Sequence, residues 1–207
     1  MLGVVAAVIA GGIVVGLVVP GSGDERVVSG AASARAFVAA WQRSLEGTWT
    51  ADGSAVRAGL KNPVTIVQRP PDRLVRRGQA VSGSVGGREV SCVVDPNATV
   101  RCHDGGASPA YATAAARQVA DLTSEVGGPA PVYLVSRVGA SCFRLRLALV
   151  VAAPPYGQAA RFCFDAATGA PTVQEHELDG VLDSQQFTAI RPAVNASDLQ
   201  LPAALEQ

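Results

Sequence analysis

The sequence predicts an α+β domain in which a strongly curved antiparallel sheet, a half-open barrel, is covered by about two helices. An N-terminal transmembrane helix is expected to precede this domain. Short segments in which apolar and polar residues alternate, separated by turn residues, predict the strands. Two segments with apolar residues at helical spacing predict the helices, one before the strand series and one midway through it. The midway helix needs a sheet to cover its apolar stripe, which indicates the α+β class.

Length and charge limit the choices further. The 207 residues allow one domain of ordinary size plus a terminal segment. Arg and Lys together number 17, and Asp and Glu together also number 17. A chain without net charge has no electrostatic preference for nucleic acid, so we expect no nucleic-acid partner.

The N-terminal segment Met1–Val19 is uncharged and almost wholly apolar. At 1.5 Å per residue, about 19 helical residues nearly cross a hydrocarbon core of about 30 Å. A cleavable signal peptide is the alternative, but no basic residue precedes the run, and Ala32-Ser33-Ala34 comes late for a cleavage site. We therefore predict a membrane anchor at residues 1–19, a linker at 20–32 and an extracytoplasmic domain at 33–207.

Both helices are predicted from their apolar faces and their start signals. Ser33 is expected to cap a helix that runs to Leu45. Ser108, followed by Pro109, is expected to start a second helix that ends near Val126. Their apolar faces comprise Phe37, Ala40, Trp41 and Leu45 in the first helix and Tyr111, Ala115, Val119, Leu122 and Val126 in the second.

The first strand series lies between the two helices. Its predicted members are Val64–Arg69, Leu74–Arg77, Val81–Val85, Arg88–Val94 and Thr99–His103. Gly86-Gly87 is a two-residue hairpin signal, because glycine tolerates the positive φ that such a turn needs. Arg73, Arg76 and Arg77 form a basic cluster that we interpret as a solvated strand face; contact with anionic lipid headgroups is the alternative.

The second strand series provides the candidate binding residues. From Cys142, the residues Phe143, Leu145, Leu147, Leu149 and Val151 fall on one side of a strand. Phe162 and Phe164 do the same in the next strand, and shorter strands are expected at Thr172–Leu178 and Phe187–Ile190. We predict that inward residues line a concave apolar patch able to hold a ligand; filling a core is the alternative role. The candidate lining residues are Trp49, Phe143, Leu145, Leu147, Phe162 and Phe164.

Four cysteines without a CxxC pair suggest disulfides. Cys92 and Cys102 flank the turn at Asp95–Asn97, so an antiparallel hairpin would bring them nearly opposite each other. Cys142 and Cys163 then remain as the second pair, although their register requires a bulge or a longer loop. The other two connectivities stay open. Two disulfides indicate an oxidising compartment, which would put the domain outside the cytoplasm.

Signals for catalysis and metal binding are weak. Ser141, His103 and Asp104 could form a hydrolase triad on paper, but no G-x-S-x-G motif accompanies them. Glycine pairs occur without the Lys-Ser/Thr of a phosphate-binding loop. We therefore expect no catalytic residues, no metal site and no cofactor.

The segment FCFDAATGAPTVQEHELDG, followed by FTAI and SDLQLP, resembles the carboxy-terminal half of the LolA/LolB-like lipoprotein-carrier superfamily. The motif residues are Asp165, Thr168, Gly169 and Pro171 in a D-x-x-T-G-x-P turn and Asp198, Leu201 and Pro202 in the tail. The resemblance spans roughly residues 33–202. It implies a half-open antiparallel barrel closed by helices, with a concavity that holds acyl chains.

Two functions follow as predictions. In the first, the anchored domain binds a lipid or another amphiphile in its concave apolar face. In the second, the interior is filled and the domain is a non-enzymatic interaction or sensor protein that binds another envelope protein. Both place a single-pass protein in the cell membrane with its C-terminal domain extracytoplasmic.

Overall fold

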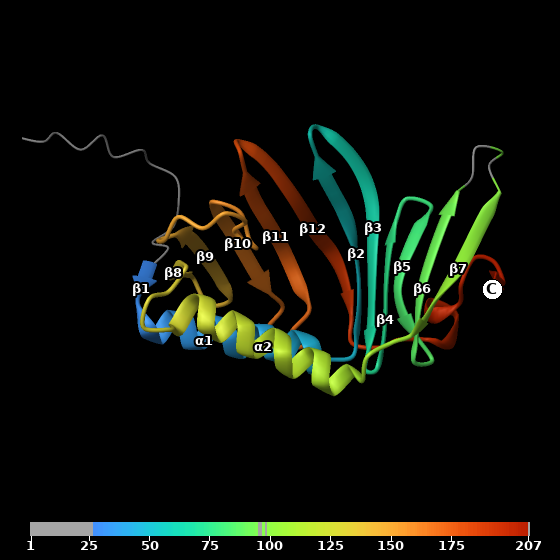
Figure 1. Ribbon diagram of the computed structural model, residues 1–207, viewed down its shortest axis with the longest axis horizontal. Coiled ribbons are helices and arrows are strands. Elements are labelled where there is room, and N and C mark those ends of the chain that lie inside the picture. Colours follow the sequence, from blue (N-terminus) through green and yellow to red (C-terminus); the bar gives the residue numbers. More distant parts are fainter. Residues whose placement is uncertain (1–26, 95–96, 98, 207) are drawn as a thin grey trace, which may run out of the picture.

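The structure, a computed structural model, describes residues 27–94, 97 and 99–206. In this part the chain forms two α-helices, a short 3-10 helix and one large sheet (Figure 1). The elements are β1 (Val27–Ser29), α1 (Ala31–Glu46), β2 (Trp49–Arg57), β3 (Leu60–Arg69), β4 (Asp72–Arg77), β5 (Ala80–Val85), β6 (Arg88–Val94), β7 (Val100–Ala107), α2 (Tyr111–Gly127), β8 (Tyr133–Val138), β9 (Cys142–Leu147), β10 (Ala159–Phe164), β11 (Pro171–Leu178), β12 (Val181–Arg191), η1 (Ala196–Leu199) and β13 (Leu205–Glu206). The predicted anchor, residues 1–19, lies outside the described residues. No helix within them is both long and apolar enough to cross a membrane.

The sheet has 13 strands in the order β1-β8-β9-β10-β11-β12-β2-β3-β4-β5-β6-β7-β13. Its neighbouring strands pair antiparallel except β13, which runs parallel to β7. The first and last strands of this order do not pair with each other, so the sheet stays open. Figure 1 shows it strongly curved, with α1 and α2 side by side across one face. The predicted class, a curved antiparallel sheet covered by two helices, is confirmed.

Both helices begin at residues other than those predicted. Helix α1 starts at Ala31 with Gly30 as its N-cap, so Ser33 is a buried residue inside the first turn. Gly30 has φ 111°, a value that favours glycine, and this allows the chain to leave β1 and enter the helix at once. Helix α2 starts at Tyr111 with Ala110 as its N-cap. The Ser108 hydroxyl instead donates a hydrogen bond to Glu89 (2.9 Å), beside the end of β7.

The strands follow the alternating segments closely, with four additions: β1, β2, β8 and β13. The predicted Arg88–Val94 matches β6, and Gly86 and Gly87 form its hairpin turn with φ 60° and 76°. Strand β8 was not predicted. Residues 27–29, expected in the linker, form β1, which pairs with β8. A three-residue strand carries no periodic pattern of its own, and its partner β8 lies more than a hundred residues further along the chain.

The strand that begins at Cys142 is shorter than predicted. It ends at Leu147, and Leu149 and Val150 are exposed in the loop 148–158. The backbone N–H groups of Ala148 and Leu149 both donate to the Val132 carbonyl, which turns the chain away from the strand direction. This loop is the longer connection that the cysteine register required.

Both predicted disulfides are present. Cys92 faces Cys102 in the β6–β7 hairpin, and Cys142 faces Cys163 between β9 and β10. In each pair the two residues are direct cross-strand partners. The alternative connectivities are therefore excluded, since every cysteine of the chain is paired.

The D-x-x-T-G-x-P segment joins β10 to β11 as a tight turn. The carboxylate of Asp165 accepts hydrogen bonds from the Thr168 hydroxyl (2.7 Å), the Thr168 N–H (2.8 Å) and the Ala167 N–H (3.2 Å). Gly169 adopts φ 74°, and a Cβ added there would lie 3.1 Å from the carbonyl of Arg43. The turn therefore packs closely against the last turns of α1 and determines where that helix ends over the sheet.

The core consists of three clusters. The first packs both helices onto β8–β10, with Phe37 of α1 and Leu122 of α2 fully buried. The second lies on the other face of β3–β7, where Leu199 and the C-terminal tail cover the Cys92–Cys102 disulfide. The third surrounds Trp49 in the middle of the sheet. Burial on both faces explains why the central strands β2 and β3 contain runs of consecutive buried residues.

Candidate functional site

Four of the six predicted lining residues come together in the first cluster. Phe143 and Leu145 of β9 and Phe162 and Phe164 of β10 are at most 5% exposed. Leu147 is only partly buried and packs against the edge of this cluster. Trp49 lies apart from them, in the third cluster. The inward direction of these side chains is as predicted.

Helix α1 covers the four residues with an aromatic side chain of its own. The ring of Phe37 lies 5.4 Å from those of Phe143 and Phe162 and 6.3 Å from that of Phe164, measured between centroids. Trp41 adds an edge contact with Phe162 at 5.3 Å. Since interiors are packed to near-crystalline density, these contacts leave the apolar rows occupied by the protein itself.

One row of the inner face changes from apolar to polar residues across the sheet. Direct cross-strand partners point to the same face, so the row that begins at Phe162 can be followed across the sheet. It continues through Gln174 of β11, Gln185 of β12 and Ala55 of β2 to Asn62 of β3. This row therefore presents amides, whereas the neighbouring row of the same face, through Phe187, Gly53 and Val64, is apolar, with Phe187 and Val64 buried.

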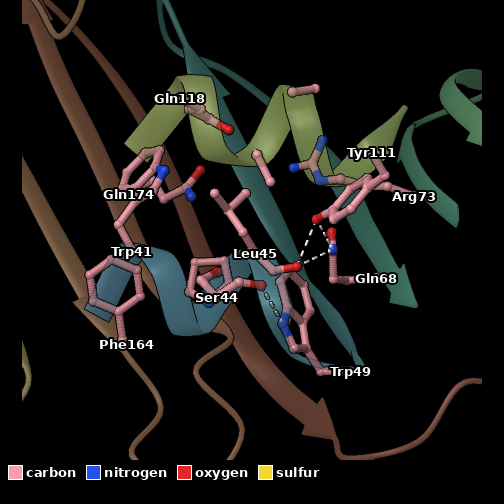
Figure 2. Close-up of a pocket in the computed structure, with 13 residues that line it drawn as sticks. Trp41, Ser44, Leu45, Trp49, Gln68, Arg73, Tyr111, Gln118, Phe164 and Gln174 are labelled. Carbon is pink, nitrogen blue, oxygen red and sulfur yellow. Dashed lines mark hydrogen bonds between the residues drawn. The ribbon is translucent and has the colours of Figure 1, made fainter. Parts of the chain in front are cut away.

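A pocket of about 200 Å³ lies between the two helices and the sheet (Figure 2). It lies where the end of α1 and the start of α2 meet the inner face of β2–β4 and β10–β11. Its lining includes Trp41, Ser44, Leu45, Trp49, Gln68, Arg73, Tyr111, Ala114, Ala115, Gln118, Phe164, Pro171 and Gln174. Trp49 and Phe164 were predicted as lining residues, whereas the polar members were not.

A hydrogen-bond network on one side of this pocket caps the end of α1. The Gln68 amide donates to the Leu45 carbonyl (2.9 Å) and to the Tyr111 hydroxyl (2.6 Å), which itself donates to the Leu45 carbonyl (2.7 Å). The Trp49 indole donates to the Ser44 carbonyl (3.1 Å; Figure 2). The last carbonyls of a helix lack partners within the helix, so these bonds satisfy them. Partial burial raises the pKa of Tyr111, and its hydroxyl stays protonated.

The three arginines of the predicted basic cluster do not share one face. Arg76 reaches the opposite side of β4, where its guanidinium donates to the carbonyls of Asp198 and Gln200. Arg73 instead lines the pocket, and Arg77 is exposed at the end of the strand. The interpretation as one solvated strand face is therefore wrong. Residues 73 and 76 are three apart in a strand, a spacing that places them on opposite faces and could have revealed this.

Four of the eight exposed large apolar side chains of the described residues lie at two hairpin tips. We call Leu60, Leu178, Val181 and Leu182 the hairpin-tip patch; they are between 48% and 71% exposed. The first three point to one face of the sheet and Leu182 to the other, so the patch wraps around the tips. Leu60 begins β3, and the other three flank the β11–β12 turn. The two hairpins are neighbours, because β12 pairs with β2 and Asp183 forms an ion pair with Arg57 at 3.7 Å. Figure 1 shows both tips projecting on the side away from α1 and α2.

The residues considered for chemistry are not assembled into a site. His103 and Asp104 lie on β7, whereas Ser141 lies between β8 and β9, near the other end of the sheet order. The Asp104 carboxylate is engaged by Arg88 and by the Gly106 N–H. Among the described residues there is no cluster of three or more His, Cys, Asp or Glu that could hold a metal ion.

Comparison with known proteins yields a distant structural likeness only. No protein-family model and no curated protein sequence matches the chain. Among solved structures it is similar to MucB in complex with MucA(peri), at 17% identity and a TM-score of 0.42, over 84% of this chain and 60% of that one. The Pseudomonas aeruginosa MucA/MucB complex is similar at 13% identity and a TM-score of 0.44, over 83% of this chain and 61% of that one. MucB alone is similar at 16% identity and a TM-score of 0.43, over 84% of this chain and 64% of that one. The chain thus spans about three fifths of the length of these structures. Because the sequence identities and TM-scores are this low, the functional argument rests on the geometry of the chain alone.

Proposed function

We propose that this chain is a non-enzymatic, membrane-anchored extracytoplasmic domain that binds another envelope protein through the hairpin-tip patch. The observation that carries the proposal is the distribution of apolar side chains. The inward rows are covered by α1, whereas Leu60, Leu178, Val181 and Leu182 remain exposed at adjacent tips. An exposed apolar patch with a polar surround is typical of an interaction site.

Charge favours a protein over a lipid surface as the occupant of the patch. Arg57 and Lys61 lie next to it, and so do Asp179 and Asp183. Anionic headgroups attract clusters of basic residues, each of which contributes about 1 kcal/mol near the membrane surface. With equal numbers of acidic and basic side chains, the tips lack such an attraction. A protein surface, where apolar contacts have a polar and charged rim, fits better.

The two disulfides support the extracytoplasmic location, because such bonds persist in oxidising compartments. The uncharged run at residues 1–19 would supply the anchor, with its amino terminus on the cytoplasmic side.

Amphiphile binding in the concave face is the competing function. Pockets for small ligands typically measure about 300–1,000 Å³, and the pocket between the helices and the sheet measures about 200 Å³. Its volume gives an acyl chain little space between the helices and the sheet; larger hollows, of about 490 Å³ between α1 and α2 and about 760 Å³ beside β1 and β8, lie elsewhere. The small volume beneath the helices supports the protein-binding proposal over binding of an acyl chain in the concave face.

Photo-crosslinking in intact cells tests the proposal. A photo-reactive residue in place of Val181 should form a covalent adduct with a protein, and its yield should fall strongly in the background Leu60→Ser/Leu182→Ser. The matched control is Leu134→Ser on β8, which is 50% exposed but distant from the tips and should leave the yield unchanged. All three leucines are exposed, so each change is expected to alter stability by only about 0.5 kcal/mol.

Two outcomes would contradict the proposal: adducts with lipid alone, or a protein adduct whose yield is the same in the patch variant. As a parallel measurement, lipid extracted from the purified chain can be identified by mass spectrometry. A stoichiometric acyl ligand would favour the carrier function instead.

A further inference from the structure

The pocket between the helices and the sheet contains hydrogen-bond donors that have no acceptor. Arg73 makes no hydrogen bond or ion pair with any described residue, although its five N–H groups form a strong donor set. The indole N–H of Trp41, in the same lining, is buried and likewise finds no partner within the described chain. Buried donors are nearly always satisfied in folded proteins. The Trp41 N–H is buried and Arg73 is half-buried, so the two together mark a place for a ligand that brings acceptors.

Charge in the pocket is of one sign. Of the described residues that line it, Arg73 alone is charged, and the others are apolar, aromatic, amide or hydroxyl side chains. Burial lowers the pKa of Arg73, and the neighbouring Arg77 acts in the same direction; an arginine nevertheless stays protonated. Arg73 is half-buried, and a partly desolvated cation without an acidic neighbour is less favourable than one in water, which an anionic ligand would relieve.

Helix α1 does not use this charge. The C-terminus of a helix attracts cations, so Arg73 could have served to cap α1. The carbonyls of Ser44 and Leu45 are already bonded by Trp49, Gln68 and Tyr111, as described above. Figure 2 shows the guanidinium of Arg73 turned into the pocket, toward the side of α2 that carries Gln118. The guanidinium is therefore left available to a ligand.

Size and lining restrict the body of that ligand. An engineered apolar cavity of about 150 Å³ binds benzene, so a pocket of about 200 Å³ takes a group slightly larger than that. Trp41, Trp49 and Phe164 provide aromatic surface for a flat body. Glutamine amides at residues 68, 118 and 174 offer further polar contacts at its edge.

We propose that this pocket is a binding site for a carboxylate carried on a benzene-sized apolar group, with Arg73 and the Trp41 indole N–H as its hydrogen-bond donors. The carboxylate can belong to a free small molecule or to the chain terminus of a bound polypeptide. Planar bidentate pairing with a carboxylate is the interaction for which a guanidinium is best shaped. The site is separate from the hairpin-tip patch and does not depend on the function proposed for it.

Calorimetric titration of the full chain with phenylacetate tests the site, with neutral phenylacetamide as the matched ligand. Because both tryptophans of the sequence line the pocket, their fluorescence provides a second readout. Phenylacetate should bind, and phenylacetamide should bind about tenfold or more weakly, since hydrogen bonds to charged groups contribute about 1.5–3 kcal/mol. Equal affinity for the two ligands, or no binding of either a carboxylate or a peptide, would overturn the proposal.

Variants separate the site from a general effect on folding. Arg73→Gln should weaken phenylacetate binding about 10- to 100-fold, while Arg77→Gln, on the same strand but outside the lining, should leave it unchanged. Trp41→Phe keeps an aromatic ring, removes the donor and should weaken binding a few-fold, to about tenfold at most. If Arg73→Gln disturbs the fold, the affinity of the Trp41→Phe variant for phenylacetate still tests the site. Unchanged affinity in both variants would refute the assignment.

The source of the carboxylate is distinguished with a short peptide that ends in phenylalanine, used with a free and with an amidated terminus. Preference for the free-terminus peptide over phenylacetate would assign the site to a polypeptide end, and the reverse preference to a small molecule. The Leu60→Ser/Leu182→Ser variant should bind phenylacetate like the wild type. A failure of the tip patch to capture a protein would therefore leave this result unaffected.

Discussion

Replacing Phe37 with alanine tests whether α1 fills the concave face of the sheet as an integral core element. Phe37 is 0% exposed, and its ring contacts those of Trp41, Phe143, Phe162 and Phe164, with centroids 5.4–6.3 Å apart. If it is core, Phe37→Ala leaves a cavity among four aromatic rings, three of which are held in place by β9 and β10. The substitution then removes both the transfer free energy of the ring and its packing contacts.

The expected loss is large. A buried Phe→Ala change costs about 3–5 kcal/mol, and the number of aromatic neighbours places this one in the upper half of that range. In a domain of this size, 1 kcal/mol shifts the Tm by about 2–4 °C. The variant should therefore melt roughly 8–20 °C below the wild type. Urea and thermal unfolding followed by circular dichroism measure both quantities.

The matched control is Leu182→Ala, which removes an apolar side chain that is 55% exposed and should cost at most about 0.5 kcal/mol. A loss below about 1 kcal/mol for Phe37→Ala would refute the filled-core reasoning. It would mean that α1 rests loosely on the sheet, as a helix that moves aside for an acyl chain would, and binding of a fluorescent fatty acid should then be measured in both variants.

Two further predictions concern acid stability and topology. Hydrogen bonds from the Thr168 hydroxyl and N–H hold the pKa of Asp165 below its ordinary value; this contribution to stability is full above about pH 4, the pKa of an unfolded aspartate, and is lost as the pH falls through the lower, folded-state pKa. Asp165→Asn should therefore reduce the difference in urea midpoint between pH 7 and pH 3, and an unaltered difference would contradict the role of this turn. For topology, protease added to intact spheroplasts should digest the domain, because the disulfides and the apolar run at residues 1–19 indicate an extracytoplasmic location. A domain that stays protected until the membrane is lysed would reverse this assignment.

Local patterns predicted much of the fold. The alternation in Phe143–Leu147 and Phe162–Phe164 correctly identified the buried face of β9 and β10, because a strand has only two faces and burial selects one of them. Gly86-Gly87 predicted the β5–β6 turn, since few other residues accept positive φ at both positions. The same hairpin reasoning predicted Cys92–Cys102, and exclusion then predicted the second disulfide.

Two polar residues of the pocket were visible in the sequence and were not used. Gln68 occupies an inward position of the alternating segment Val64–Arg69, where an apolar residue would be expected. Arg73 stands one residue before Leu74, so it lies on the face opposite that leucine. A polar side chain at an inward position is informative because burial without a partner is costly.

The sequence by itself predicted the class of fold, the buried face of β9 and β10 and the proximity of Cys92 to Cys102, because these depend on contacts between neighbours along the chain or across one hairpin; it left the other disulfide connectivities open. Only the tertiary structure decided that Phe37 covers the apolar rows, that the exposed leucines and valine meet at adjacent tips, and that Arg73 shares a pocket with Trp41. Residues of the pocket come from α1, α2 and five strands, and Trp41 and Gln174 are more than a hundred residues apart. Their meeting depends on the curvature of the sheet and on where α1 ends over it, and neither leaves a periodic signal in the sequence.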